Sequence, residues 1–223
     1  MLILAVVSVT MAFVLMGFKS VAFQEDHDLS LSRQYITYAY LVLAASNILH
    51  LVYGFRVQQP SVGIALDITA YFLVAILLSY VYIPLIYPYY RKSRVKWLHI
   101  SCWFLSSACL WTASLFTYGL LSTILITVGG VLCIASIVRI LVDFIRRYHI
   151  ESDTLTDTDL YSIESFRRFM YRSALLMGFV GVASVGVTLF GNLDWKSYFS
   201  IFSAFIFFLL GMSYINYVTN LKG

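Results

Sequence analysis

Charged residues are scarce in this sequence. Asp, Glu, Lys and Arg make up only 12% of its 223 residues, whereas 61% of the residues are hydrophobic. A typical soluble domain has about 25% charged and under 50% apolar residues. The composition therefore excludes an ordinary soluble domain and indicates an integral membrane protein. The net charge of +4 reflects how the basic residues are distributed between the two sides of the membrane, and does not indicate nucleic-acid binding.

The motifs of the common enzyme and metal sites are also missing. The three cysteines, Cys102, Cys109 and Cys133, lie inside apolar runs and show no CxxC or His/Cys spacing, so no disulfide framework, metal or cofactor is expected. HExxH, GxSxG and a glycine-rich phosphate loop are absent, which argues against an enzyme. The last apolar run has Lys196 only at its outer end, so a retinal Schiff base is not expected.

Seven apolar runs are long enough to cross the membrane, which takes about 20 helical residues. They lack the alternation of barrel strands and are about twice as long, so helices are predicted. We expect an all-α seven-transmembrane bundle that forms a single domain over residues 1–223. The predicted helices cover residues 2–18, 34–54, 61–87, 95–118, 120–142, 169–190 and 195–218.

Basic residues predict the orientation, because Lys and Arg near helix ends favour the cytoplasm. Thirteen of the fifteen Lys and Arg residues fall on one side of the seven runs, and only Arg56 and Lys196 fall on the other. The N-terminus is therefore predicted outside and the C-terminus inside. The same count argues against a cleaved signal peptide, since cleavage would move the basic side outward. We expect a multi-pass protein of a bacterial inner membrane.

The longest polar stretch, residues 146–168, has five acidic residues between two arginine pairs. As a calcium loop it fits poorly, because the third ligand position is Leu155 and the sixth is Thr158 instead of glycine. We instead predict that Asp157 or Thr158 caps a helix that continues into the sixth apolar run. A docking surface for a cytoplasmic partner is the alternative.

Four polar residues inside the second and third runs form the main candidate site. His50 and Asp67 lie at similar distances on either side of the turn VQQP, so both are expected about 10 Å below it on adjacent helices. Asn47 and Tyr71 lie one turn deeper. A charge inside the hydrocarbon region is costly, so Asp67 should face the bundle and find a partner. Two interpretations stay open: a structural tie between the helices, or a ligand- or proton-responsive site open to the envelope side.

Aromatic residues near the predicted outer ends are a second candidate. Trp111 and Trp195 lie within about two turns of those ends, as do Tyr53, Phe55 and Tyr198, and we expect them to line a shallow ligand pocket. Aromatic rings are also common membrane-interface anchors, and this interpretation stays open.

The stretches SLSRQYITYAYLVLAASNILHLVYG and IALDITAYFLVAILLSYVYIPLIYP, followed by a basic loop, resemble the membrane portion of bacterial membrane-bound AraC-type regulators. The segments FRRFMYRSALLMGF and FIFFLLGMSYINYV are also similar to that pattern. In such proteins the helices precede a cytoplasmic helix-turn-helix domain, and none is present in these 223 residues. The sequence is therefore either a piece of a longer regulator or similar in its membrane part alone.

Two hypotheses on function follow. In the first, the chain is a sensory or anchoring domain that relays an envelope signal, such as a small-molecule ligand, to a cytoplasmic DNA-binding effector or partner protein. A homodimer is then expected if the effector binds paired half-sites. In the second, the chain is a small seven-helix transporter, or a membrane protein that binds lipid or a small molecule.

Overall fold

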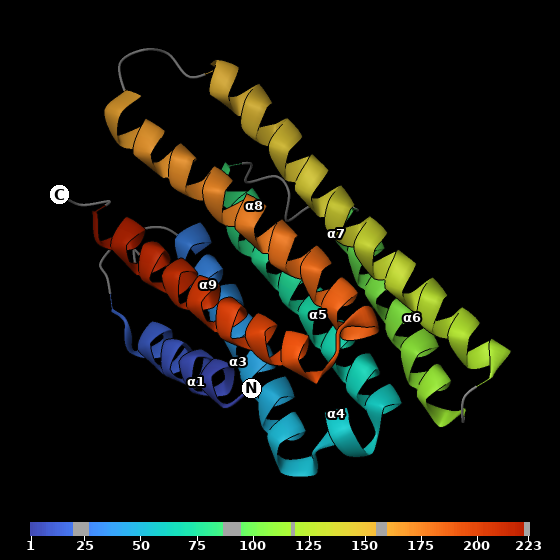
Figure 1. Cartoon of the computed structure of the whole chain (residues 1–223). Coiled ribbons are helices and arrows are strands. Elements are labelled where there is room, and N and C mark those ends of the chain that lie inside the picture. Colours follow the sequence, from blue (N-terminus) through green and yellow to red (C-terminus); the bar gives the residue numbers. More distant parts are fainter. Residues whose placement is uncertain (20–26, 87–94, 117–118, 155–159, 221–223) are drawn as a thin grey trace.

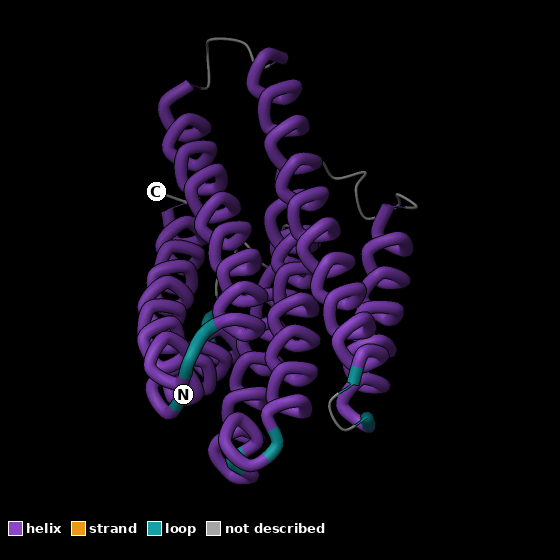
Figure 2. Tube along the Cα trace, turned by 45° about the vertical axis from the view of Figure 1, so that its right-hand side comes forward, coloured by secondary structure: helices purple, strands orange, loops and turns teal. Residues whose placement is uncertain are grey.

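The computed structural model describes residues 1–19, 27–86, 95–116, 119–154 and 160–220, and in these ranges every regular element is a helix (Figure 2). The helices run back and forth between two ends of the molecule (Figure 1). They are α1 (Leu2–Gly17), α3 (His27–Tyr53), α4 (Phe55–Gln58), α5 (Pro60–Ile86), α6 (Val95–Leu115), α7 (Leu120–Thr154), α8 (Leu160–Phe190) and α9 (Leu193–Asn220).

Six of these helices are long and apolar enough to cross a membrane, which confirms a helical membrane protein. The apolar spans within them are His27–Tyr53, Pro60–Ile83, Lys96–Leu115, Leu120–Arg147, Tyr171–Phe190 and Asp194–Thr219. The seventh predicted span corresponds to α1, which is apolar but has only 16 residues. Helix α1 still packs along the bundle, against α3 and α9.

Two predicted helix boundaries were wrong by more than a turn. Helix α3 begins at His27 instead of residue 34, and α7 continues past residue 142 to Thr154. Helix α8 begins at Leu160, so a helix does lead into the sixth apolar run at residues 169–190. Hydropathy marks where a helix leaves the apolar layer, whereas the backbone hydrogen bonds continue into the polar flanks. The predicted cap at Asp157 or Thr158 lies outside the described residues, although a helix does begin shortly after it.

Five helices form a closed ring. Around it α1 contacts α3, α3 contacts α5, α5 contacts α8, α8 contacts α9, and α9 contacts α1. Tyr40 spans the ring, because its hydroxyl on α3 donates to the carbonyl of Phe207 on α9. Helices α6 and α7 lie outside the ring against α5, and α7 also packs on α8. Helix α5 is therefore central, since it contacts both the ring and the outer pair.

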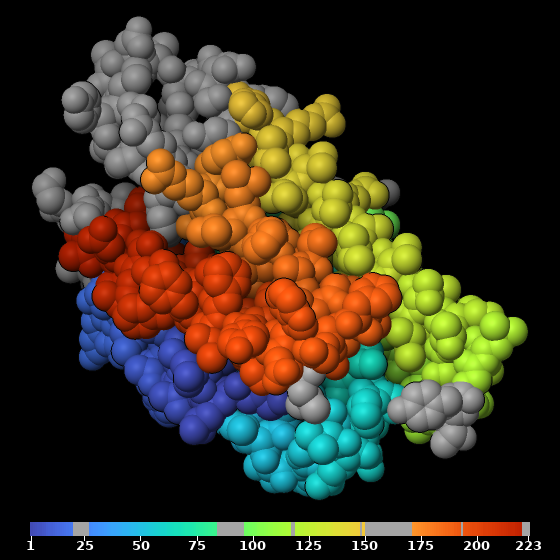
Figure 3. Space-filling view, viewed as in Figure 1, coloured from blue at the N-terminus to red at the C-terminus, as the bar shows by residue number. Residues whose placement is uncertain are grey.

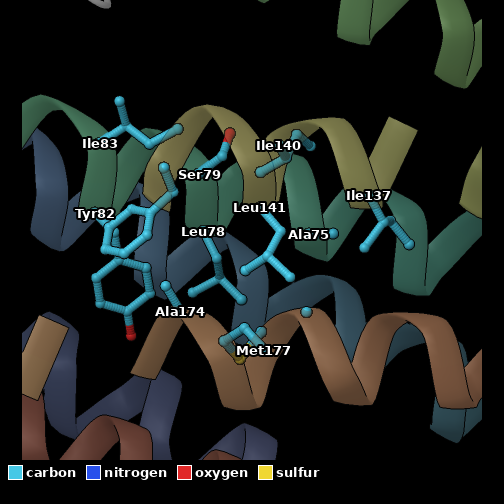
Figure 4. A pocket seen from close by; sticks show the side chains of 12 residues that line it. Ala75, Leu78, Ser79, Tyr82, Ile83, Ile137, Ile140, Leu141, Ala174 and Met177 are labelled. Carbon is cyan, nitrogen blue, oxygen red and sulfur yellow. The ribbon is translucent and has the colours of Figure 1, made fainter. Parts of the chain in front are cut away.

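Small residues bring α8 close to α7, as its glycines predict. A Cβ at Gly178 would lie 3.0 Å from Leu141, and one at Gly181 would lie 3.2 Å from Ile137. Beside this contact, apolar side chains of α5, α7 and α8 surround a cavity of about 40 Å³. In Figure 4, Leu78 and Leu141 point into the same space as Met177. This volume is far below the roughly 300 Å³ of the smallest typical ligand sites, so we regard it as a packing gap.

Candidate functional site

A short helix between α3 and α5 builds the outer part of the site. Helix α3 ends at Tyr53, and the next residue, Gly54, has a left-handed φ of 61° and donates its N–H to the carbonyl of His50 at 3.0 Å. Glycine adopts this conformation without the penalty of a Cβ, so it reverses the chain within one residue. Helix α4 then lies against α5, where a Cβ at Gly63 would touch the backbone of Arg56 at 3.4 Å. The expected polar turn is thus a helical turn held against the bundle.

The structure brings His50 and Asp67 together, as their predicted depth implies. His50 Nε2 lies 2.9 Å from Asp67 Oδ1, and the two side chains are 0% and 4% exposed. Tyr35 and Tyr80 are also in contact further along, with ring centroids 5.4 Å apart, so α3 and α5 keep an antiparallel register. Asp67 therefore has a partner inside the bundle, which is what the cost of a buried charge requires.

Arg56 completes the site, and sequence reasoning missed this role. Its Nε donates to Asp67 Oδ2 at 3.0 Å and its Nη2 donates to Oδ1 at 2.8 Å, a two-point pairing that suits the planar guanidinium. The side chain of Arg56 is only 8% exposed. The sequence held one signal, because a lone arginine in a short turn next to a membrane-buried aspartate suggests a pair. We call His50, Arg56 and Asp67 the outer charge cluster.

The hydrogen bonds of the outer charge cluster indicate which proton His50 carries. An aspartate paired with Arg56 is ionised and can only accept, so His50 Nε2 is the donor in their bond. His50 Nδ1 is buried and has no hydrogen-bond partner in the described structure. In a neutral imidazole this second nitrogen is an acceptor. His50 Nδ1 is therefore the unpartnered acceptor of the cluster in the described structure.

Aromatic rings cover the outer charge cluster. Phe55 of α4 lies edge-on to His50 with centroids 6.3 Å apart, and it stacks on Tyr53 at 5.2 Å. In the space-filling view, α4 and the start of α5 (cyan) form the lower edge of the molecule next to α1 (dark blue) (Figure 3). The side chains of the cluster are at most 8% exposed, so they are buried where α4 packs against α5.

Asn47 and Tyr71 extend the polar surface toward the interior of the ring. Asn47 Nδ2 donates to the carbonyl of Leu43 at 2.8 Å, and its Oδ1 is buried and has no partner among the described residues. The Tyr71 hydroxyl lies beside that of Ser203 on α9 but not in hydrogen-bonding geometry, and both are buried. Buried polar groups normally have partners, so these atoms are exceptions among the described residues.

Two predicted site residues are not part of this group. Trp111 on α6 is 41% exposed, and Trp195 in the first turn of α9 is 65% exposed. They lie on helices that belong to different parts of the bundle, since α6 packs on α5 and α7 while α9 packs on α1 and α8. The exposed rings suit contact with the membrane interface. The expected aromatic pocket is therefore not formed by these two residues.

Two further observations concern the charges near the site and metal binding. Lys196 of α9 lies close enough for its charge to interact with both Arg56 and Asp67. Among the described residues no group of three His, Cys, Asp or Glu side chains could hold a metal ion.

Comparison of the chain with protein-family models, curated proteins and solved structures finds no match.

Proposed function

We propose that this chain is a membrane-embedded sensory domain with its input at the outer charge cluster. The observation that carries the proposal is the buried contact of His50, Arg56 and Asp67, which joins α3, α4 and α5. Titration near neutral pH is typical of histidine, and a change in its charge alters the attraction within such a cluster. The signal is a proton, or a small hydrogen-bond donor that binds at His50 Nδ1.

The proposed output is the pair α7–α8. Helix α5 contacts both of these helices as well as α3, so a shift at its outer end is transmitted through direct packing. Both helices continue past their apolar spans, from Arg147 to Thr154 in α7 and from Leu160 to Tyr171 in α8. In Figure 1 their ends project beyond the rest of the bundle, where a partner could bind.

We further propose that seven helices, α1 included, cross a bacterial inner membrane, with the N-terminus outside. Thirteen basic residues on one side support this orientation. In Figures 1 and 2 the N-terminus and α4 lie toward one end of the bundle, and the joined ends of α7 and α8 lie at the other. On the resemblance to membrane-bound AraC-type regulators, the proposed effector is a cytoplasmic DNA-binding domain or partner, acting as a homodimer. A periplasm-active reporter enzyme should work when fused at Gln58 and fail at Arg147; activity at Arg147 would reverse the orientation.

The distance between α7 and α8 tests the proposed input. Spin labels replace the exposed Arg146 and Arg172, and the protein is reconstituted in lipid nanodiscs. Between about pH 9 and pH 4.5 the distance distribution should change in the otherwise native chain, because a proton taken up by the outer charge cluster adds a positive charge beside Arg56. His50→Gln should abolish the change, whereas His149→Gln, which removes an exposed histidine near the other end, should preserve it. A distribution that does not respond to pH, or that responds equally in both variants, would overturn this input.

A second candidate function is the binding of a lipid or small molecule. It is favoured by a cavity of about 430 Å³ between the ends of α5, α6, α7 and α8, whose lining does not include His50, Arg56 or Asp67. This volume is within the range of small-molecule sites, roughly 300–1,000 Å³. A transport function has no comparable support, since the ring interior is closed by side chains such as Tyr40 and Leu43.

A further inference from the structure

The 430 Å³ cavity has a lining of unusual composition. It lies where α5 and α7 begin and where α6 and α8 end, at the same end of the bundle as α4. Five of its lining side chains carry a hydroxyl, and most of the others are apolar. The hydroxyl-bearing residues are Ser61, Ser114, Ser122, Thr123 and Thr127.

None of the described residues that line this cavity carries a charge. A charged ligand that entered the cavity would lose its contacts with water and would find no opposite charge among these residues. Burying an unpaired charge in this way is costly. The cavity therefore favours an uncharged ligand. The outer charge cluster, in contrast, has its ionic partners already in place.

The hydroxyl groups favour a ligand that donates hydrogen bonds. A Ser or Thr hydroxyl has one proton and two lone pairs, so a hydroxyl that donates to the backbone can only accept from a ligand. Four of the five donate in this way. The bonds run from Ser114 to the Trp111 carbonyl at 2.7 Å, from Ser122 to Ala113 at 3.2 Å, from Thr123 to Gly119 at 3.2 Å and from Thr127 to Thr123 at 2.8 Å.

Apolar side chains border the same cavity. Leu115 and Phe190 are 83% and 88% exposed, so both side chains are accessible to surrounding lipid. A ligand that reaches the cavity from the bilayer can keep its hydrocarbon chain beside these residues. Its uncharged polar group can then donate hydrogen bonds to the threonine and serine oxygens.

We propose that this cavity binds the hydroxyl-bearing headgroup of an uncharged membrane lipid, of the acylglycerol class. Ile64 on the cavity wall lies one helical turn before Asp67, so the lipid also contacts the segment of α5 that carries the outer charge cluster. The site does not depend on the proposed sensory function. It requires only the cavity, its acceptor oxygens and its apolar border.

Binding can be measured by native mass spectrometry of the purified full chain in detergent. The probes are monooleoylglycerol, the same lipid with both hydroxyls O-methylated, oleoyl phosphatidic acid and free glycerol. We expect monooleoylglycerol to bind about tenfold more tightly than its methylated analogue, the effect of one or two lost hydrogen bonds. Equal binding of the methylated lipid, or tighter binding of the phosphatidic acid, would overturn the proposal. If free glycerol bound with the same affinity, the ligand would not have to come from the membrane, and the assignment to a lipid would be refuted.

Two threonines offer a matched pair of variants. Thr127 in the cavity and Thr219 on α9 are both exposed, and each donates to the carbonyl four residues earlier at 2.8 Å. Thr127→Val should weaken binding of monooleoylglycerol about tenfold, whereas Thr219→Val should leave it unchanged. Thr127→Ser keeps the hydroxyl and should retain binding, which separates a lost acceptor from a folding defect. Equal effects of the two valine variants would refute the site.

Discussion

The outer charge cluster makes a quantitative prediction about stability. Asp67→Asn keeps the shape of the side chain but removes the negative charge that faces Arg56 and His50. Two unit charges about 4 Å apart interact with ~4 kcal/mol at an effective dielectric constant of about 20. Removing one member of a buried pair typically costs about 3–5 kcal/mol, because the other charge is left buried. Arg56 lies at the outer end and can turn toward water, so we expect a loss of about 3 kcal/mol.

Thermal unfolding in one detergent or nanodisc preparation measures this loss. For a chain of this size, 3 kcal/mol corresponds to a fall in Tm of roughly 6–12 °C. The double variant Arg56→Gln/Asp67→Asn carries no charge at either position, so it leaves no unpaired charge buried. It should therefore recover at least half of the stability that Asp67→Asn loses. Lys196→Gln is the matched control, because it removes a nearby cation without a direct ion pair to Asp67 among the described contacts. A double variant that loses the full sum of the two single effects would refute the charge argument, as would a Tm of Asp67→Asn equal to that of the native chain.

Two further predictions concern the ring interior. A Cβ at Gly211 would lie 2.8 Å from the Tyr40 hydroxyl oxygen, so Gly211→Ala should lower stability by about 1–3 kcal/mol, whereas Gly186→Ala, with open space around it, should change thermal unfolding little. Tyr40→Phe breaks the bond to the Phe207 carbonyl and should cost about 1 kcal/mol, but Tyr71→Phe removes a hydroxyl that has no hydrogen-bond partner among the described residues and should cost nothing or stabilise. A Tyr71→Phe variant that loses as much stability as Tyr40→Phe would show that the Tyr71 hydroxyl is bonded.

The depth of the polar residues could be predicted from the sequence, because the rise per helical residue is constant. Counting from the VQQP turn placed His50 and Asp67 level with each other, and their side chains are in contact. The same count placed Trp111 and Trp195 near one end of the bundle. It gave no information on which helices are neighbours, and these two residues lie on helices that do not share a contact surface.

The role of Arg56 could not be read from the sequence with the same method. As one of two basic residues on its side, it was counted only as a marker of orientation. Its position on α4 follows the left-handed backbone of Gly54, after which the chain turns so that the guanidinium reaches Asp67. The extension of α7 to Thr154 was missed for a related reason, since hydropathy reports the surroundings of a helix and not its hydrogen bonding.

The position of the outer charge cluster is informative about its purpose. Replacing a buried ion pair by well-packed apolar residues is often neutral or stabilising, so stability alone does not explain three polar side chains in an apolar bundle. These side chains join α3, α4 and α5 at the point where the chain reverses, and α5 is the helix that contacts both the ring and the outer pair. A change in their charge acts on the relative position of α3 and α5, whereas an apolar contact would not respond to protons or polar ligands. The cluster therefore combines a histidine with the helix that contacts the most neighbours among the described elements, as the proposed sensory function requires.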